Sequence, residues 1–254
     1  GLKNISALRN TRNIRQFVLS GAGTILPVSD LHVLQNNVNM KKLEIKRTEI
    51  SDLRPIAGWK KLRSLILDEN PQLTSSDGIG GIKNLRVLSL NDCKNLRDIN
   101  EIEKLKKLKI LNLNHCTALK ESELQALAPL IQMKELALDH VNISDLGAVI
   151  YGMKKLRVIS LRSTDLKDID VLAQYGRLAD VNLDGTGIKN ILALKNLPLE
   201  ELSVVDIELE DLYADLTEFS SDLIWITYSR GMMTKRQVKE LKGQHPLWWF
   251  IKSD

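Results

Sequence analysis

A pattern of leucines that returns at a fixed interval constrains this chain more than any other feature. Leu-x-x-Leu-x-Leu-x-x-Cys occupies residues 85–93 and occurs again, 23 residues later, at 108–116. Related apolar triplets start at residues 14, 40, 62, 133, 156, 178 and 199, with a degenerate copy at 223. A constant period of about 20–29 residues is the signature of a solenoid, in which each repeat buries its apolar side chains against the next.

Alternation of apolar and polar residues within each repeat predicts a short strand. Successive strands are expected to pair in parallel, about 4.8 Å apart, in one concave sheet. The residue three positions past each strand is expected to point inward and bond backbone groups: Ala22, Thr48, Asn70, Cys93, Cys116, Val141, Thr164, Thr186 and Ile207. A recurring aspartate should then accept bonds from free amides on the convex side: Asp52, Asp98, Asp145, Asp168 and Asp211.

Two stretches resemble known repeats. LEIKRTEISDLRPIAG at 43–58 is similar to the short 22-residue repeats of internalins and phosphatase regulators. LSLNDCKNLRDI at 88–99 resembles the cysteine-containing repeats of plant immune receptors and protozoan proteins. The chain therefore resembles a leucine-rich-repeat protein with repeats of 22–25 residues. This resemblance implies an α/β fold, a curved right-handed horseshoe with a parallel concave sheet, short helices or turns on the convex side and a C-terminal cap.

The period divides the chain into about nine repeats over residues 1–222 and a capping segment over 223–254. TKRQVKELK at 234–242 predicts a helix, and LWWFI at 247–251 predicts a last strand. We interpret Trp248, Trp249 and Phe250 as part of a cap over the open end of the core, with an aromatic docking surface as the alternative. Trp59 and Tyr175 occupy equivalent repeat positions and are expected in the core.

The sequence predicts no catalytic set, cofactor or metal site, and hence a non-enzymatic protein. Cys93 and Cys116 take equivalent positions in adjacent repeats, which predicts buried free thiols, with a disulfide as the alternative. His115 and His140 are also equivalent, but a clear third metal ligand is missing from the pattern. Cysteine-rich caps, usual in extracellular animal repeat proteins, are absent, which predicts a cytoplasmic location, with a bacterial surface or a secreted effector as alternatives.

A column of basic residues is the clearest functional signal. It occupies the first exposed position of seven consecutive strands and is called the basic stripe: Arg15, Lys41, Arg63, Arg86, Lys109, Lys134 and Arg157. A stripe of one sign attracts an anionic partner, although such residues also serve solubility. Charge divides along the chain, because residues 1–67 hold 12 basic and 4 acidic residues whereas residues 176–222 hold 3 basic and 11 acidic ones. The acidic end disfavours nucleic acid.

We predict a protein-recognition module or scaffold that binds a partner protein on its concave face. The expected contacts mix charged and amide groups at the middle of that face: Asp68, Asn91, Asn112, Asn114, Asp139, His140 and Arg162. One alternative is an anionic ligand, a phospholipid or nucleic acid, bound by the basic stripe. Another is the sensor domain of a larger receptor or effector, because the chain starts in the middle of a repeat.

Overall fold

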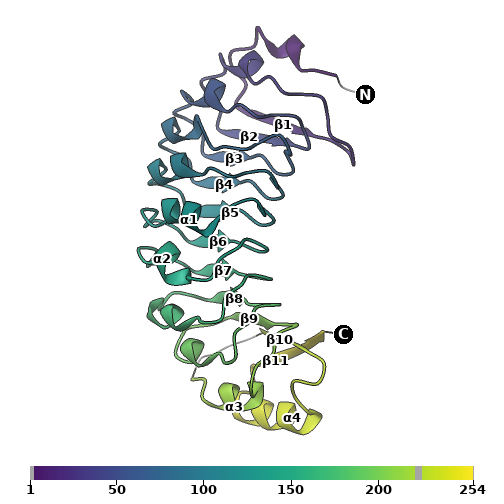
Figure 1. Cartoon of the computed structure of the whole chain (residues 1–254), viewed down its shortest axis with the longest axis vertical. Coiled ribbons are helices and arrows are strands. Elements are labelled where there is room, and N and C mark those ends of the chain that lie inside the picture. Colours follow the sequence, from purple (N-terminus) through teal and green to yellow (C-terminus); the bar gives the residue numbers. More distant parts are fainter. Residues whose placement is uncertain (1–2, 221–224, 254) are drawn as a thin grey trace. The chain divides into compact units, whose positions relative to one another are not determined.

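The structure, a computed structural model, describes residues 3–220 and 225–253 of the chain (Figure 1). The chain divides into two compact units, one of residues 1–133 with 149–153 and the other of residues 134–148 with 154–254. In each unit, short strands follow one another in sequence order and pair in parallel. This is the leucine-rich-repeat solenoid that the period predicted.

In the part of the first unit that the structure describes there are five strands: β1 (Gln16–Ser20), β2 (Lys42–Lys46), β3 (Ser64–Ile66), β4 (Val87–Ser89) and β5 (Ile110–Asn112). A helical turn precedes each of these strands, and two more follow β5: η1 (Ser6–Leu8), η2 (His32–Leu34), η3 (Arg54–Ile56), η4 (Ile79–Gly81), η5 (Asn100–Lys104), α1 (Glu121–Leu124) and η6 (Gln125–Leu127). The register aligns equivalent repeat positions, so that Leu43 faces Leu65 and Leu65 faces Leu88. Figure 1 shows the helical turns along one side of these strands.

The described residues of the second unit form six strands: β6 (Glu135–Ala137), β7 (Val158–Ser160), β8 (Asp180–Asn182), β9 (Glu201–Val204), β10 (Trp225–Ser229) and β11 (Trp249–Ser253). Its helices are η7 (Asp170–Gln174), η8 (Leu192–Leu194), α3 (Leu212–Thr217) and α4 (Lys235–Gln244), while α2 (Leu146–Ile150) has residues in both units. The degenerate repeat is confirmed as β10. Leu223, its predicted first apolar residue, lies outside the described residues.

The period-2 alternation decides which strand residues are buried. In β4, for example, Leu88 is fully buried between the half-buried Val87 and Ser89. Trp59 and Tyr175 are each 1% exposed, which confirms both as core residues. None of the described helices combines the length and the apolar character needed to cross a membrane.

The inward column that follows the strands is confirmed in eight of its nine predicted members: Thr48, Asn70, Cys93, Cys116, Val141, Thr164, Thr186 and Ile207 are all buried. Ala22 was predicted to join them and is exposed. The reason is that the chain leaves β1 by another path: the Gly21 amide donates to the Lys46 carbonyl at 3.2 Å, and Leu26 then bridges to Thr48.

The residues of this column differ in how many backbone groups each one hydrogen-bonds. The Asn70 amide group donates to the carbonyls of Ile45 at 2.9 Å and Leu67 at 2.8 Å, and its oxygen accepts from the Thr48 amide at 2.9 Å. The Cys93 thiol makes one such bond, to the Leu67 carbonyl at 3.1 Å. A thiol is a weak hydrogen-bond donor. Asparagine therefore satisfies the backbone carbonyls and amides of this turn better than cysteine does.

The recurring aspartates accept amide hydrogen bonds at the start of each helical turn, as predicted. The donors are the amides of Arg54, Asn100, Ala148, Asp170 and Ala214, at 2.9, 2.8, 3.2, 2.6 and 3.0 Å from Asp52, Asp98, Asp145, Asp168 and Asp211 respectively. These carboxylates therefore stabilise the fold, because they satisfy amides that a short helix leaves without partners.

The tail forms the predicted helix and strand. Thr234 caps α4 in a capping box with Gln237, and β11 pairs in parallel with β10. Trp248 is 3% exposed and stacks on His245, with ring centres 3.8 Å apart. Trp249 is 58% exposed. The two tryptophans therefore face opposite ways, and only Trp248 packs into the core.

Candidate functional site

The face of the strands away from the core is the candidate recognition surface, and we call it the open face. In the second unit its first row runs from β6 to β11: Glu135, Val158, Asp180, Glu201, Trp225 and Trp249. Its second row is Ala137, Ser160, Asn182, Ser203, Thr227 and Ile251. Along the unit, the first row ends in two aromatic side chains, whereas the second row ends in Thr227 and Ile251.

Two tryptophans form an exposed aromatic pair on the open face of the second unit. Trp225 is 44% exposed and stacks against Trp249 with ring centres 5.8 Å apart and planes 26° apart. Ile251, the next open-face residue of β11, is 45% exposed. Lys242 of α4 lies 5.9 Å from the centre of the Trp249 ring. Trp249 was predicted to be part of the cap, with an aromatic docking surface as the alternative. Its pairing with Trp225 was not predicted, although the alternation within WIT at 225–227 and WFI at 249–251 could have revealed it.

The open face of the first unit begins with a network of charges. Lys42 and Lys46 both contact the Glu44 carboxylate, at 3.0 and 3.2 Å, and Lys46 also contacts Asp68 at 3.2 Å. The hydrogen bond from Lys42 is the main reason that the pKa of Glu44 is lowered. Further along, the half-buried Val87 and Ile110 give the face a more apolar character.

The predicted contact residues of the first unit make hydrogen bonds with one another and with Ser89 at the ends of the strands. Asp68 accepts from the Ser89 hydroxyl at 2.5 Å and from the Asn91 amide at 3.1 Å. Asn112 accepts from the Asn114 amide at 2.9 Å. Each of these four predicted residues therefore takes part in an internal bond, and their role in partner binding stays a prediction.

The predicted contact residues of the second unit repeat this arrangement. Asp139 accepts from the Ser160 hydroxyl at 2.6 Å and from the Arg162 amide at 3.0 Å. Asp184, which was not among the predicted residues, does the same two repeats later, where it accepts from the Ser203 hydroxyl at 2.7 Å. His140 has a positive φ of 58°. It occupies the left-handed turn position that ends each strand.

The basic stripe forms a column in space within each unit. In the first unit, the amides of Lys41, Arg63, Arg86 and Lys109 each donate to the preceding member's carbonyl, at 2.7, 2.9, 2.9 and 2.9 Å. In the second unit, the Arg157 amide donates to the Lys134 carbonyl at 2.8 Å. These residues lie at the strand starts, on the edge of the open face.

The groups with potential for chemistry have structural roles. Cys93 and Cys116 are buried and free. Burial raises the pKa of Cys93 to about 12 and also raises that of Cys116, which keeps both thiols neutral. His115 has a φ of 58° and ends its strand as His140 does. Among the described residues, no three or more His, Cys, Asp or Glu side chains gather as a metal site.

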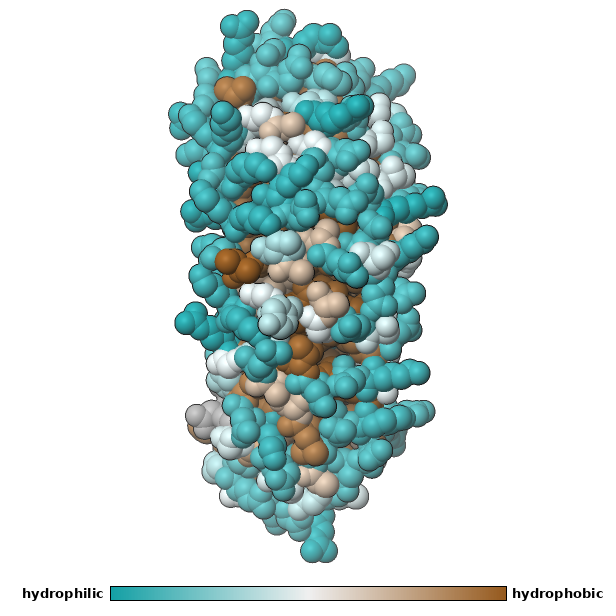
Figure 2. Space-filling view, turned by 60° about the vertical axis from the view of Figure 1, so that its left-hand side comes forward, coloured by the Kyte–Doolittle hydropathy of each residue, from teal (hydrophilic) through white to brown (hydrophobic). Residues whose placement is uncertain are grey.

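Most of the surface in Figure 2 is hydrophilic, and hydrophobic side chains show between the charged ones. The exposed apolar side chains include Tyr151 at 73%, Leu247 at 70% and Ile131 at 54%. Single exposed apolar residues of this kind are normal on a protein surface. The stacked Trp225 and Trp249 differ from them because they are neighbours on one sheet face.

Comparison with known proteins supports the fold. A family model described as Leucine Rich repeats (2 copies) matches residues 83–129. No curated protein matches the sequence. The structure of an internalin (inlF) from Listeria monocytogenes is similar with a TM-score of 0.78 and 22% sequence identity, over 99% of this chain and 73% of that one.

Two further solved structures are similar. Internalin C2 (inlC2) of Listeria monocytogenes has a TM-score of 0.55 and 23% identity, over 82% of this chain and 80% of that one. The plant peptide hormone receptor RGFR1, in complex with RGF2, has a TM-score of 0.57 and 19% identity, over 92% of this chain and 40% of that one. At these identities the likeness is one of fold.

Proposed function

Because this chain folds as a leucine-rich-repeat solenoid, a fold that generally serves protein interaction, we propose that it is a non-enzymatic recognition module that binds a partner protein on its open face. The stacked, exposed Trp225 and Trp249 are the observation that carries this proposal. Tryptophan is enriched among the few residues that dominate the binding energy of interfaces. An exposed pair of them has no role in the core of the repeats.

The rest of the open face suits a protein better than a small ligand. Its strands are parallel and closely spaced, so that side chains from neighbouring repeats form continuous rows. Asp180 and Glu201 precede the tryptophans in the first row. The partner should therefore present an apolar group beside basic or hydrogen-bonding groups. The receptor RGFR1 shows that a similar fold is found in complex with another molecule.

The test is binding by a variant that truncates the tryptophans. We expect Trp225→Ala with Trp249→Ala to weaken the partner complex by roughly 2 kcal/mol or more, about thirtyfold, as for hot-spot residues. The control is Leu247→Ala, which removes an apolar side chain that is 70% exposed but lies before β11. Affinity capture with each variant, followed by titration of the captured protein, measures this. Equal binding by the double variant and the wild type would contradict the proposal.

A further inference from the structure

The basic stripe ends at Arg157 in the second unit, and a cavity opens beside the next position of the column. The column of strand starts continues from Arg157 to Ala179 and then to Glu200, with amide-to-carbonyl bonds of 2.8 and 2.7 Å. Ala179 stands where the seven preceding positions carry lysine or arginine. The space that a long cationic side chain would occupy belongs instead to a cavity of about 420 Å³.

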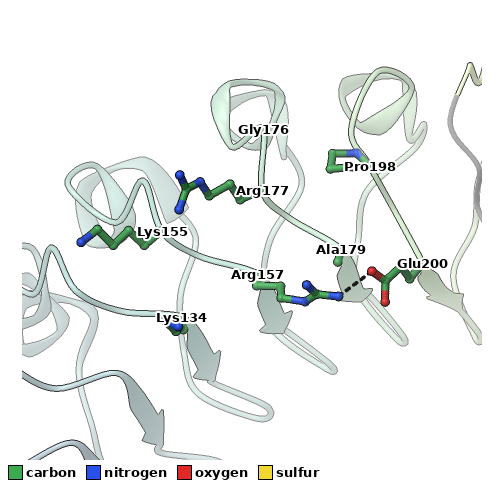
Figure 3. A pocket seen from close by; sticks show the side chains of 8 residues that line it. All are labelled: Lys134, Lys155, Arg157, Gly176, Arg177, Ala179, Pro198 and Glu200. Carbon is green, nitrogen blue, oxygen red and sulfur yellow. Dashed lines mark hydrogen bonds and ion pairs between the residues drawn. The ribbon is translucent and has the colours of Figure 1, made fainter.

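The lining of this cavity is strongly basic. It consists of Lys134, Lys155, Arg157, Gly176, Arg177, Ala179, Pro198 and Glu200, that is, four cations and one anion. Figure 3 shows Arg157 directed toward Glu200, and Arg177 directed the other way, toward Lys155. The formal charge of the lining is therefore +3.

Part of this charge is already paired, but only by a surface contact. Arg157 Nη2 lies 2.5 Å from Glu200 Oε1, and the two side chains are 56% and 53% exposed. An ion pair in water contributes little, typically 0 to about 1 kcal/mol. An incoming anion can therefore share the Arg157 guanidinium without a large loss of stability.

Arg177 lacks the kind of partner that two lysines at the same repeat position have in the first unit. In the first unit, the lysines at the same repeat position donate to an asparagine of the preceding repeat, Lys61 to Asn39 at 2.7 Å and Lys107 to Asn84 at 2.8 Å. Arg177 has Lys155 and Pro198 beside it in the cavity instead. Within the part of the chain that the structure describes, its guanidinium has neither a hydrogen-bond nor an ion-pair partner.

We propose that this cavity is a binding site for a phosphate group. The group comes either as free phosphate or as a phosphorylated side chain of a protein. Guanidinium groups bind phosphate oxygens in a bidentate manner, which favours arginine at such sites. A phosphate monoester carries close to two negative charges at neutral pH. It therefore matches a lining of net charge +3 better than a single carboxylate does. This site is separate from the tryptophans, so the proposal holds whether or not the open face binds a partner.

Two variants test the cavity itself. Ala179→Arg places the usual residue of the column into the cavity and adds a positive charge. If shape matters, this variant loses binding; if only diffuse positive charge matters, it binds more tightly. Arg177→Gln removes the unpartnered guanidinium and should weaken binding about tenfold, the value of one charge-assisted hydrogen bond. Lys107→Gln is the matched control, because it removes one charge at the same repeat position in the first unit.

The experiment titrates the whole chain with inorganic phosphate and, separately, with a short capped peptide that contains phosphoserine, at constant ionic strength. Chemical shifts of the Gly176 and Ala179 amides report binding at the site. We expect the wild type and Lys107→Gln to bind, Arg177→Gln to bind about tenfold more weakly, and Ala179→Arg to show no saturable shift. Tighter binding of the peptide identifies a phosphorylated partner, and equal binding identifies free phosphate as the ligand.

Three results would overturn the proposal. The first is no saturable binding of either probe by the wild type. The second is binding by Ala179→Arg that equals or exceeds that of the wild type. The third is equal weakening by Lys107→Gln and Arg177→Gln, which would mean that net charge alone attracts the probes. Circular dichroism of each variant confirms that it is folded.

Discussion

Asn70 is expected to be the most sensitive polar residue of the first unit. Its side chain is fully buried, donates to the carbonyls of Ile45 and Leu67, and accepts from both the amide and the hydroxyl of Thr48, at 2.9 and 2.6 Å. Replacement by alanine removes all of these bonds from a site that water does not reach. A buried polar group without a partner costs about 1–3 kcal/mol. Since the Cys93 thiol still donates to Leu67, we expect Asn70→Ala to cost roughly 3–5 kcal/mol in total.

The control for Asn70→Ala is Thr164→Val, at the same position of a later repeat. The Thr164 hydroxyl makes a single bond, to the Leu161 carbonyl at 2.7 Å, so its loss should cost about 1 kcal/mol. Urea unfolding followed by circular dichroism gives both free-energy changes. If Asn70→Ala destabilises the protein no more than Thr164→Val does, the reasoning about this column is wrong.

Two further predictions concern buried ionisable groups. Cys93 and Cys116 should react with a thiol reagent at pH 7 only when the protein is unfolded, because both are buried and burial raises the pKa of Cys93 to about 12; rapid labelling of the native protein would contradict this. Asp215 is 7% exposed, and burial is the main cause of its raised pKa. Its ionisation therefore opposes folding above the raised pKa and has no effect below the ordinary aspartate pKa. We expect Asp215→Asn, which can still accept from the Ile191 amide, to stabilise the protein at pH 7 and to lose this advantage as the pH falls through the aspartate range; equal stabilisation at low pH would refute the assignment.

The repeat period made most of the fold predictable. It placed the strands and the inward column from Thr48 to Ile207, which depend on contacts between equivalent positions of adjacent repeats. It also placed the five capping aspartates, each of which accepts from an amide two or three residues later in its own repeat. The prediction that Ala22 points inward was wrong because the chain leaves the first strand by another path, through Gly21. A regular period carries no information about such a departure.

The candidate surfaces were less predictable. Asp68 and Asp139 were predicted to contact a partner on the concave face, and the period does not show that each accepts a hydrogen bond from a serine of the next repeat. Trp249 was grouped with Trp248 because the register of the last strand was not fixed by the period. The cavity beside Ala179 depends on the absence of a side chain, and a search for motifs does not detect an absence.

Photo-crosslinking is the most direct test of whether a partner protein binds on the open face. A crosslinking amino acid is placed on the open face at Ile110 or Asp180, and on the helical side at Glu103 or Ala173, so that each unit carries one position of each kind. We expect adducts with a partner protein from the open-face positions and few from the helical side. Adducts that form mainly at Glu103 or Ala173 would contradict it.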